Sequence, residues 1–102
     1  TTAKISSLDF SSNSKLTSLK ITHSEISDLE TSNYNNLDNI LLLDLSFNQL
    51  QSLDISRFII LESLNIVGNS NLDCVEINQN QLSSIPKGWI KDSSSEYNID
   101  CN

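Results

Sequence analysis

The segment ILLLDLSFNQLQSLDIS, residues 40–56, decides the fold. Counted from Ile40, its aliphatic residues fall at relative positions 1, 4, 6, 11 and 14, and Asn48 stands at position 9. Apolar and polar residues alternate around positions 4 and 6, which is the period of a half-buried strand. Position 9 then falls where the chain turns, and an asparagine side chain can bond the backbone groups that a turn leaves free. The segment predicts a short strand followed by a polar turn.

The same columns recur along the chain. Further copies start at Leu16, Leu61 and Leu72, and a partial copy starts at Ile5. The successive full copies are offset by 24, 21 and 11 residues, so the first carries three extra residues, most simply placed within 33–39, and the last follows a shortened copy. Self-similarity at such a period predicts a solenoid of stacked coils.

Two further features follow from stacking the copies. Asn69 and Asn80 share position 9 with Asn48, and Ser24 stands there in the first full copy. Stacking predicts an asparagine ladder inside the turns. The alternating segment at 53–56 predicts a second short extended edge on the far side of each coil.

The pattern LxxLxLxxNxL resembles the leucine-rich repeat family, and the resemblance covers essentially the whole chain. The 21-residue spacing and the segment NQLQSLDIS are similar to repeats of secreted multidomain proteins from Bacteroidetes-type bacteria. The resemblance implies a leucine-rich repeat solenoid with short parallel strands on one face, irregular or extended segments on the other, and a C-terminal cap. The chain departs from that subclass at position 6, where cysteine is common, and it carries aliphatic residues there that do the same packing: Ile21, Leu45, Ile66 and Ile77.

A chain of 102 residues predicts one domain, with a partial repeat over 1–15, repeats over 16–85 and a cap over 86–102. In the cap we expect Trp89 to lie over the open end of the core and a strand around Tyr97. No comparable cap stands at the N-terminal end, so we interpret the chain as the C-terminal part of a longer array.

The two cysteines, Cys74 and Cys101, are expected to form a disulfide that staples the terminal segment to the last strand. The same pair also resembles the cap of the secreted repeat proteins. Two free core thiols are the alternative. A disulfide would imply an oxidising, secreted or cell-surface setting.

Composition excludes several functions. The net charge of −7, with six Lys and Arg residues, argues against nucleic-acid binding, and the longest apolar runs, 40–43 and 58–61, are too short to insert into a membrane. The motifs of catalytic sites are missing from the sequence, and no cofactor or metal is expected. An acidic column at position 15, namely Asp9, Glu30 and Asp54, is interpreted as a solvated face that stops at Pro86, with calcium binding as the minor alternative.

Binding is therefore the expected activity, through the exposed strand positions. Position 5 holds Lys20, Asp44, Asn65 and Glu76, while positions 7 and 8 hold Val67, His23 and Phe47 among others. The candidate partner-binding residues are Lys20, His23, Leu42, Asp44, Phe47, Phe58, Ile59 and Val67. The apolar members are expected to form one exposed patch rimmed by Asp44 and Glu62. The alternative is that Phe58 and Ile60 fold into the core.

These residues predict a non-catalytic extracellular module that recognises a protein. A carbohydrate-binding or adhesion module is the alternative, but sugar platforms present planar aromatic side chains, and only Phe47, Tyr34 and Tyr97 qualify. A structural spacer is the third possibility.

Overall fold

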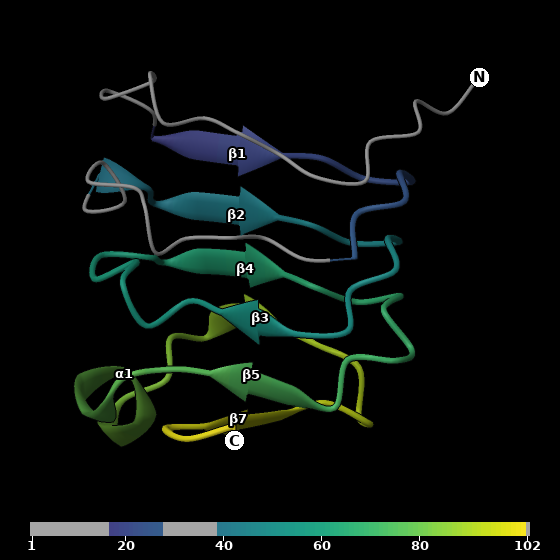
Figure 1. Cartoon of the computed structure of the whole chain (residues 1–102). Helices are drawn as coiled ribbons and strands as arrows, with labels where there is room; N and C mark the ends of the chain where they lie inside the picture. The colour runs from purple at the N-terminus through teal and green to yellow at the C-terminus, as the bar shows by residue number, and fades with distance from the viewer. Residues whose placement is uncertain (1–16, 28–38, 102) are drawn as a thin grey trace.

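The chain is a small β-solenoid built from two parallel sheets. A computed structural model describes residues 17–27 and 39–101. The first sheet contains β1 (Ser18–Lys20), β2 (Leu42–Asp44), β4 (Ser63–Asn65) and β6 (Gly88–Ile90), in that order. The second contains β3 (Leu53–Asp54), β5 (Cys74–Glu76) and β7 (Glu96–Asn98). The chain passes from one sheet to the other and back for about three turns, so the expected parallel strands with extended segments on the far side are confirmed (Figure 1).

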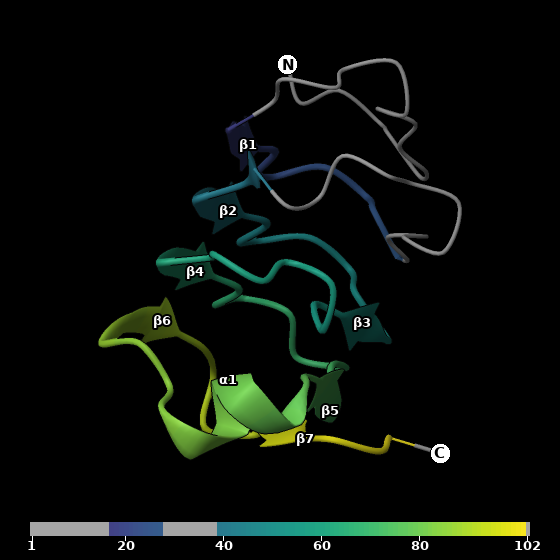
Figure 2. The ribbon, with the colours of Figure 1, turned by 90° about the vertical axis from the view of Figure 1, so that its left-hand side faces the viewer.

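The core lies between the two sheets, which face one another in the side view (Figure 2). Strand alternation points Leu43 and Leu64 inward, and the parallel register places Leu64 between Leu43 and Trp89. Val75 points into the same core from the second sheet. Because each strand has only two or three residues, burial of these stacked side chains, at about 1.5–3 kcal/mol each, stabilises the coils more than the ladders do.

The repeat pattern predicted that the segment starting at Leu72 forms another strand of the first sheet, but it does not. β5 lies in the second sheet, where Val75 pairs with Leu53 and Glu76 pairs with Asp54. The prediction was wrong because an LxxLxI pattern satisfies the inward and outward alternation of either sheet equally well. The segment completes the coil that begins at β4, and the next strand of the first sheet is β6.

The C-terminal segment expected to form a cap contributes β6 and β7, which add one strand to each sheet. Trp89 is the inward residue of β6 and is buried, with its Nε1–H donating to the carbonyl of Leu61 at 3.1 Å. The strand expected around Tyr97 is confirmed as β7. The two rings pack with centroids 5.5 Å apart and Lys91 Nζ lies 5.5 Å from the Tyr97 centroid, so these side chains close the last coil.

A short helix, which the repeat pattern did not predict, connects β5 to β6 along the chain. α1 (Gln79–Ser83) begins after Asn78, whose side chain accepts a hydrogen bond from the N–H of Gln81 while the Gln81 side chain accepts from the N–H of Asn78. This reciprocal capping box was visible in the sequence as Asn-x-x-Gln. The helix carries Asn80 away from the turns, so its predicted place in the asparagine ladder is wrong.

The asparagine ladder is confirmed at Asn48 and Asn69. The Asn69 side-chain amide donates to the carbonyls of Leu45 and Ile66, and its Oδ1 accepts from the N–H of Leu50. One coil earlier the Asn48 amide donates in the same way to the carbonyls of Ile21 and Leu45, and its Oδ1 accepts from the N–H of Ser24. Each amide therefore bonds its own turn and the preceding coil, which fixes the stacking of the coils.

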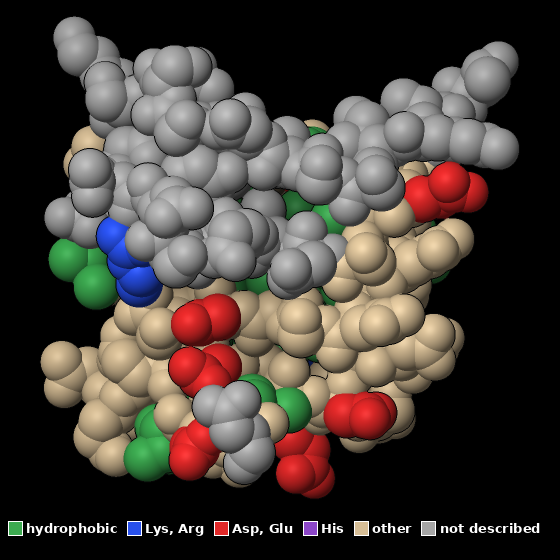
Figure 3. Space-filling view, in the orientation of Figure 1, with side chains coloured by type: hydrophobic (Ala, Val, Ile, Leu, Met, Phe, Trp, Pro, Cys, Tyr) green, Lys and Arg blue, Asp and Glu red, His purple; other side chains and the backbone are tan. Residues whose placement is uncertain are grey.

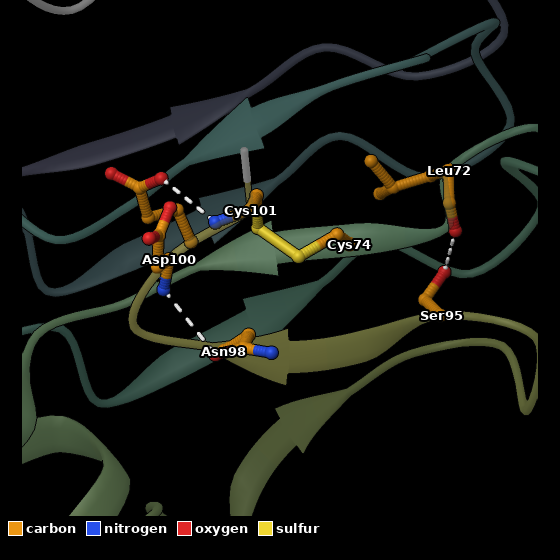
Figure 4. Close-up of a disulfide and its surroundings, with 7 residues drawn as sticks. Leu72, Cys74, Ser95, Asn98, Asp100 and Cys101 are labelled. Carbon is orange, nitrogen blue, oxygen red and sulfur yellow. Dashed lines mark hydrogen bonds between the residues drawn. A yellow bond between two sulfur atoms is a disulfide. The ribbon is translucent and has the colours of Figure 1, made fainter.

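The predicted disulfide between Cys74 and Cys101 is confirmed, and the free-thiol alternative is excluded. The bond joins β5 to the residue that follows β7 by three positions (Figure 4). Ser95 Oγ donates to the carbonyl of Leu72 at the other end of the same strand pair. The terminal segment is thus attached at both ends of β7.

Candidate functional site

The outward face of the first sheet is formed by four neighbouring parallel strands. Its strands lie side by side along the left edge of the molecule in Figure 2. Alternate residues of each strand point away from the core. The outward residues are Ser18, Lys20, Leu42, Asp44, Ser63, Asn65, Gly88 and Ile90. Leu42 is 37% exposed and Ile90 49% exposed, so the face combines apolar and polar side chains.

Three predicted binding residues, Lys20, Leu42 and Asp44, lie on this face. Asp44 also holds its own turn, since its Oδ1 accepts from the N–H of Ser46 at 3.0 Å. Glu76, predicted to lie on the same face, lies on the second sheet because β5 belongs there. Ile90 takes its place beside Asn65. Sequence reasoning missed Ile90 because it assigned 86–102 to a cap, although Trp89 follows Leu64 by nearly the interval that separates Leu43 from Leu19.

A stacked column borders this face where the strands end. His23, Phe47 and Gly68 occupy equivalent turn positions and have φ angles of 56°, 57° and 83°. The His23 and Phe47 rings stack with centroids 4.9 Å apart and planes 17° apart. This left-handed conformation is unusual for residues other than glycine. The ladder of asparagine bonds in the same turns offsets its cost.

Gly68 makes room for the Phe47 ring from the other side. A Cβ atom at Gly68 would lie 2.5 Å from Phe47 Cδ1 and 2.9 Å from Cε1, which is too close for a real contact. The ring therefore has His23 from the preceding coil against one side and Gly68 from the following coil against the other. Phe47 is 51% exposed although His23 stacks on its ring and Gly68 lies against it.

Replacing Gly68 with alanine should lower the free energy of unfolding by about 2 kcal/mol. The new side chain must adopt a left-handed φ and must also displace the Phe47 ring from its stack. Urea unfolding followed by circular dichroism measures the change. In a Phe47→Ala background the same substitution should cost about 1 kcal/mol less, because only the backbone strain remains. Equal costs in both backgrounds would show that Gly68 and Phe47 do not pack together.

The predicted single apolar patch is divided between the two ends of the first sheet. Phe47 and Val67 lie where the strands end, and the Phe47 N–H donates to the Val67 carbonyl at 2.9 Å. Ile59 lies before β4, beside a cavity of about 180 Å³ next to α1, and is 61% exposed. Phe58 has no exposed surface and belongs to the core, so it is not a surface contact. The alternative that Phe58 and Ile60 fold into the core is correct for Phe58 and wrong for Ile60, which is 43% exposed.

The second sheet carries an acidic outer face. Asp54 and Glu76 are register partners on adjacent strands, and Figure 3 shows acidic side chains gathered over β3 and β5. The expectation that the acidic column stops at Pro86 is wrong, since Glu76 follows Asp54; Asp9 and Glu30 lie outside the described residues. Within the ranges 17–27 and 39–101, no three potential metal ligands come together. Asp54 instead accepts hydrogen bonds from the N–H and Oγ of Ser56, which holds a turn.

Tyr97 is the one side chain of the described part whose buried polar atom has no hydrogen-bond partner. Burial raises the pKa of Tyr97 from 10.0 to about 12. A phenol with a raised pKa in the folded state ionises first in the unfolded chain. Ionisation of Tyr97 therefore does not affect the free energy of unfolding below pH 10, and it lowers that free energy as the pH rises from 10 to about 12.

Replacing Tyr97 with phenylalanine should leave stability at pH 7 unchanged or raise it by up to about 1 kcal/mol, because a buried unpaired hydroxyl is removed. Between pH 10 and 12 the wild type should lose about 1 kcal/mol relative to the variant, a value reduced for the solvent that reaches this partly buried ring. Urea titrations of both proteins at each pH measure the difference. Parallel pH profiles would contradict the buried environment of the hydroxyl.

Comparisons with known proteins found no match, neither among family models, nor among curated proteins, nor among solved structures. Among the described residues, no helix is long and apolar enough to cross a membrane.

Proposed function

We propose that this chain is a non-catalytic recognition module of the leucine-rich repeat type, which binds an extracellular protein through the outward face of its first sheet. The observation that carries the proposal is the exposure of Leu42 and Ile90 on a flat, four-stranded face with the neutral side chains of Ser63 and Asn65 between them. Apolar residues set among polar ones in this way are typical of protein contacts. The asparagine turns and the parallel strands support the repeat type.

Protein recognition is favoured over glycan binding by the aromatic side chains. A sugar stacks on the open face of a ring, and both sides of the Phe47 ring are occupied by His23 and Gly68. Tyr97 packs against Trp89 beneath Lys91. Tyr34 lies outside the described residues. Neither described candidate offers a free platform for a sugar ring.

A secreted or cell-surface setting is part of the proposal, and the disulfide supports it. Disulfides persist mainly outside reducing compartments. Cys74 and Cys101 are the only cysteines, and both are used in this bond. The expected role as a surface module is in agreement with that chemistry.

A binding comparison with a matched control tests the proposal. Three proteins are immobilised: wild type, the face variant Leu42→Ser/Ile90→Ser and the control variant Leu82→Ser/Ile99→Ser. Each is exposed to the extracellular proteins of the organism that produces this chain. All four substituted residues are between 37% and 49% exposed, so the two double variants remove similar surfaces. Urea unfolding of each variant establishes that the fold is kept.

We expect proteins that wild type and the control variant retain and the face variant does not. Retention should change little between about 0.05 and 0.5 M salt, because an apolar contact is weakly screened. Retention abolished by glycosidase treatment of the sample would support the glycan alternative. Equal retention by all three proteins would contradict the proposed face.

A further inference from the structure

The disulfide lies on the solvent side of the second sheet. Strand alternation in β5 points Val75 into the core and sends Cys74 and Glu76 outward. Cys101 is exposed and Cys74 is partly exposed, and Figure 4 shows the sulfur bridge linking the two residues beside β5. The bond is therefore within reach of small thiols in solution.

Carboxylates surround this bond on the same face. Glu96 is the register partner of Cys74 and points outward, because its neighbour Tyr97 packs inward. Glu76 Oε1 accepts a hydrogen bond from the N–H of Cys101 at 3.3 Å, and Asp54 follows Glu76 in register on β3. The space-filling view shows acidic side chains spread over this face (Figure 3). The disulfide thus lies in a local field of negative charge.

We infer that these carboxylates select the thiols that can reduce the Cys74–Cys101 bond. The attacking species in disulfide exchange is a thiolate. An aminothiol attacks as a zwitterion without net charge, whereas a sulfonate thiol attacks with two negative charges. A surface potential of several kT changes the local concentration of a charged reagent on the order of ten-fold or more. Aminothiols, which attack without net charge, reduce the bond readily, and anionic thiols reduce it slowly.

The exchange balances in two steps. The first thiolate bonds to Sγ of Cys101, the more exposed of the two residues. Sγ of Cys74 leaves as a thiolate that takes a proton from water. A second thiolate attacks the reagent's sulfur in the mixed disulfide and releases Cys101, which is protonated in turn. Two reagent thiols are oxidised to one disulfide, and the protein gains two electrons and two protons.

Rates of reduction with two small thiols test the inference. Cysteamine and 2-mercaptoethanesulfonate are reacted with the oxidised protein, and alkylation followed by mass measurement counts the free thiols over time. The test variant is Glu76→Gln/Glu96→Gln, in which the amide oxygen of residue 76 can still accept from Cys101. The control variant is Glu25→Gln/Glu62→Gln, which changes exposed carboxylates outside the second sheet. Each double variant changes the net charge from −7 to −5, since two carboxylates are neutralised.

The measured quantity is the ratio of the cysteamine rate to the sulfonate rate, in which the intrinsic difference between the reagents cancels between proteins. At about 10 mM salt we expect this ratio to fall at least several-fold in the test variant and to stay near the wild-type value in the control. At about 1 M salt the wild-type and test ratios should converge. Equal ratios in wild type and test variant, or an equal fall in both variants, would overturn the inference, because the local carboxylates would not be the cause.

Discussion

Replacing Asn69 with leucine is expected to lower the free energy of unfolding by about 4 kcal/mol or more. The side chain has no exposed surface and pairs three buried backbone groups, the carbonyls of Leu45 and Ile66 and the N–H of Leu50. Leucine has a similar volume but leaves the Ile66 carbonyl and the Leu50 N–H without a partner, while the Leu45 carbonyl keeps only the bond from the Asn48 amide. Each unpaired buried group costs about 1–3 kcal/mol. Urea unfolding followed by circular dichroism measures the loss.

Two further variants make this result specific. Asn69→Asp keeps the acceptor for Leu50 but cannot donate to the two carbonyls when ionised, so it should also be strongly destabilising near pH 7. Asn71 is exposed and lies two residues after Asn69. Asn71→Leu should change the free energy of unfolding by less than about 0.5 kcal/mol. A loss below about 1 kcal/mol for Asn69→Leu would show that the ladder does not hold the coils together.

Replacing Phe58 with alanine should lower the free energy of unfolding by about 4 kcal/mol. The ring has no exposed surface, so its removal loses the burial of an aromatic side chain and leaves a cavity that the core fills only in part. The surrounding turn is held by its own bonds, from the Phe58 N–H to Ile55 and from Leu61 to the Phe58 carbonyl. A rigid turn relaxes little, which keeps the cost high. Equilibrium unfolding in urea measures it.

The neighbouring residue supplies the control for Phe58. Ile59 is 61% exposed, and Ile59→Ala should change stability by less than about 0.5 kcal/mol. A large loss for Phe58 with a negligible one for Ile59 would agree with the division of the predicted patch. Similar small losses at both positions would place the Phe58 ring on the surface, in the exposed apolar patch that the sequence predicted.

The features that could be predicted from the sequence are those with a single structural solution. An asparagine at the turn must pair free backbone groups, and its recurrence predicted the ladder at Asn48 and Asn69. Two cysteines with matching strand patterns around them predicted the staple between Cys74 and Cys101. The outward position of Lys20, Leu42 and Asp44 followed from period-two alternation within one strand.

The features that were not predicted lie in segments whose local sequence fits two different structures equally well. The segment around Val75 fits either sheet, since both require the same alternation, and only the pairing of neighbouring coils chooses the second. Because of that error, Ile90 was not predicted to lie on the outward face of the first sheet, and Glu76 was predicted to lie there although it belongs to the second sheet. The sequence of α1 is also compatible with a strand and a turn, and the capping box of Asn78 and Gln81 stabilises the helix. Phe58 could pack either way because aromatic residues in loops do both.

The assignment of strands to sheets determines which residues form the proposed binding face, and nuclear Overhauser effects between neighbouring strands test it most directly. We predict cross-strand contacts from the backbone of Leu64 to that of Trp89, and from Val75 to both Leu53 and Tyr97. Backbone-to-backbone contacts between Leu64 and Val75, which the repeat pattern alone would place on adjacent strands of one sheet, would contradict the account.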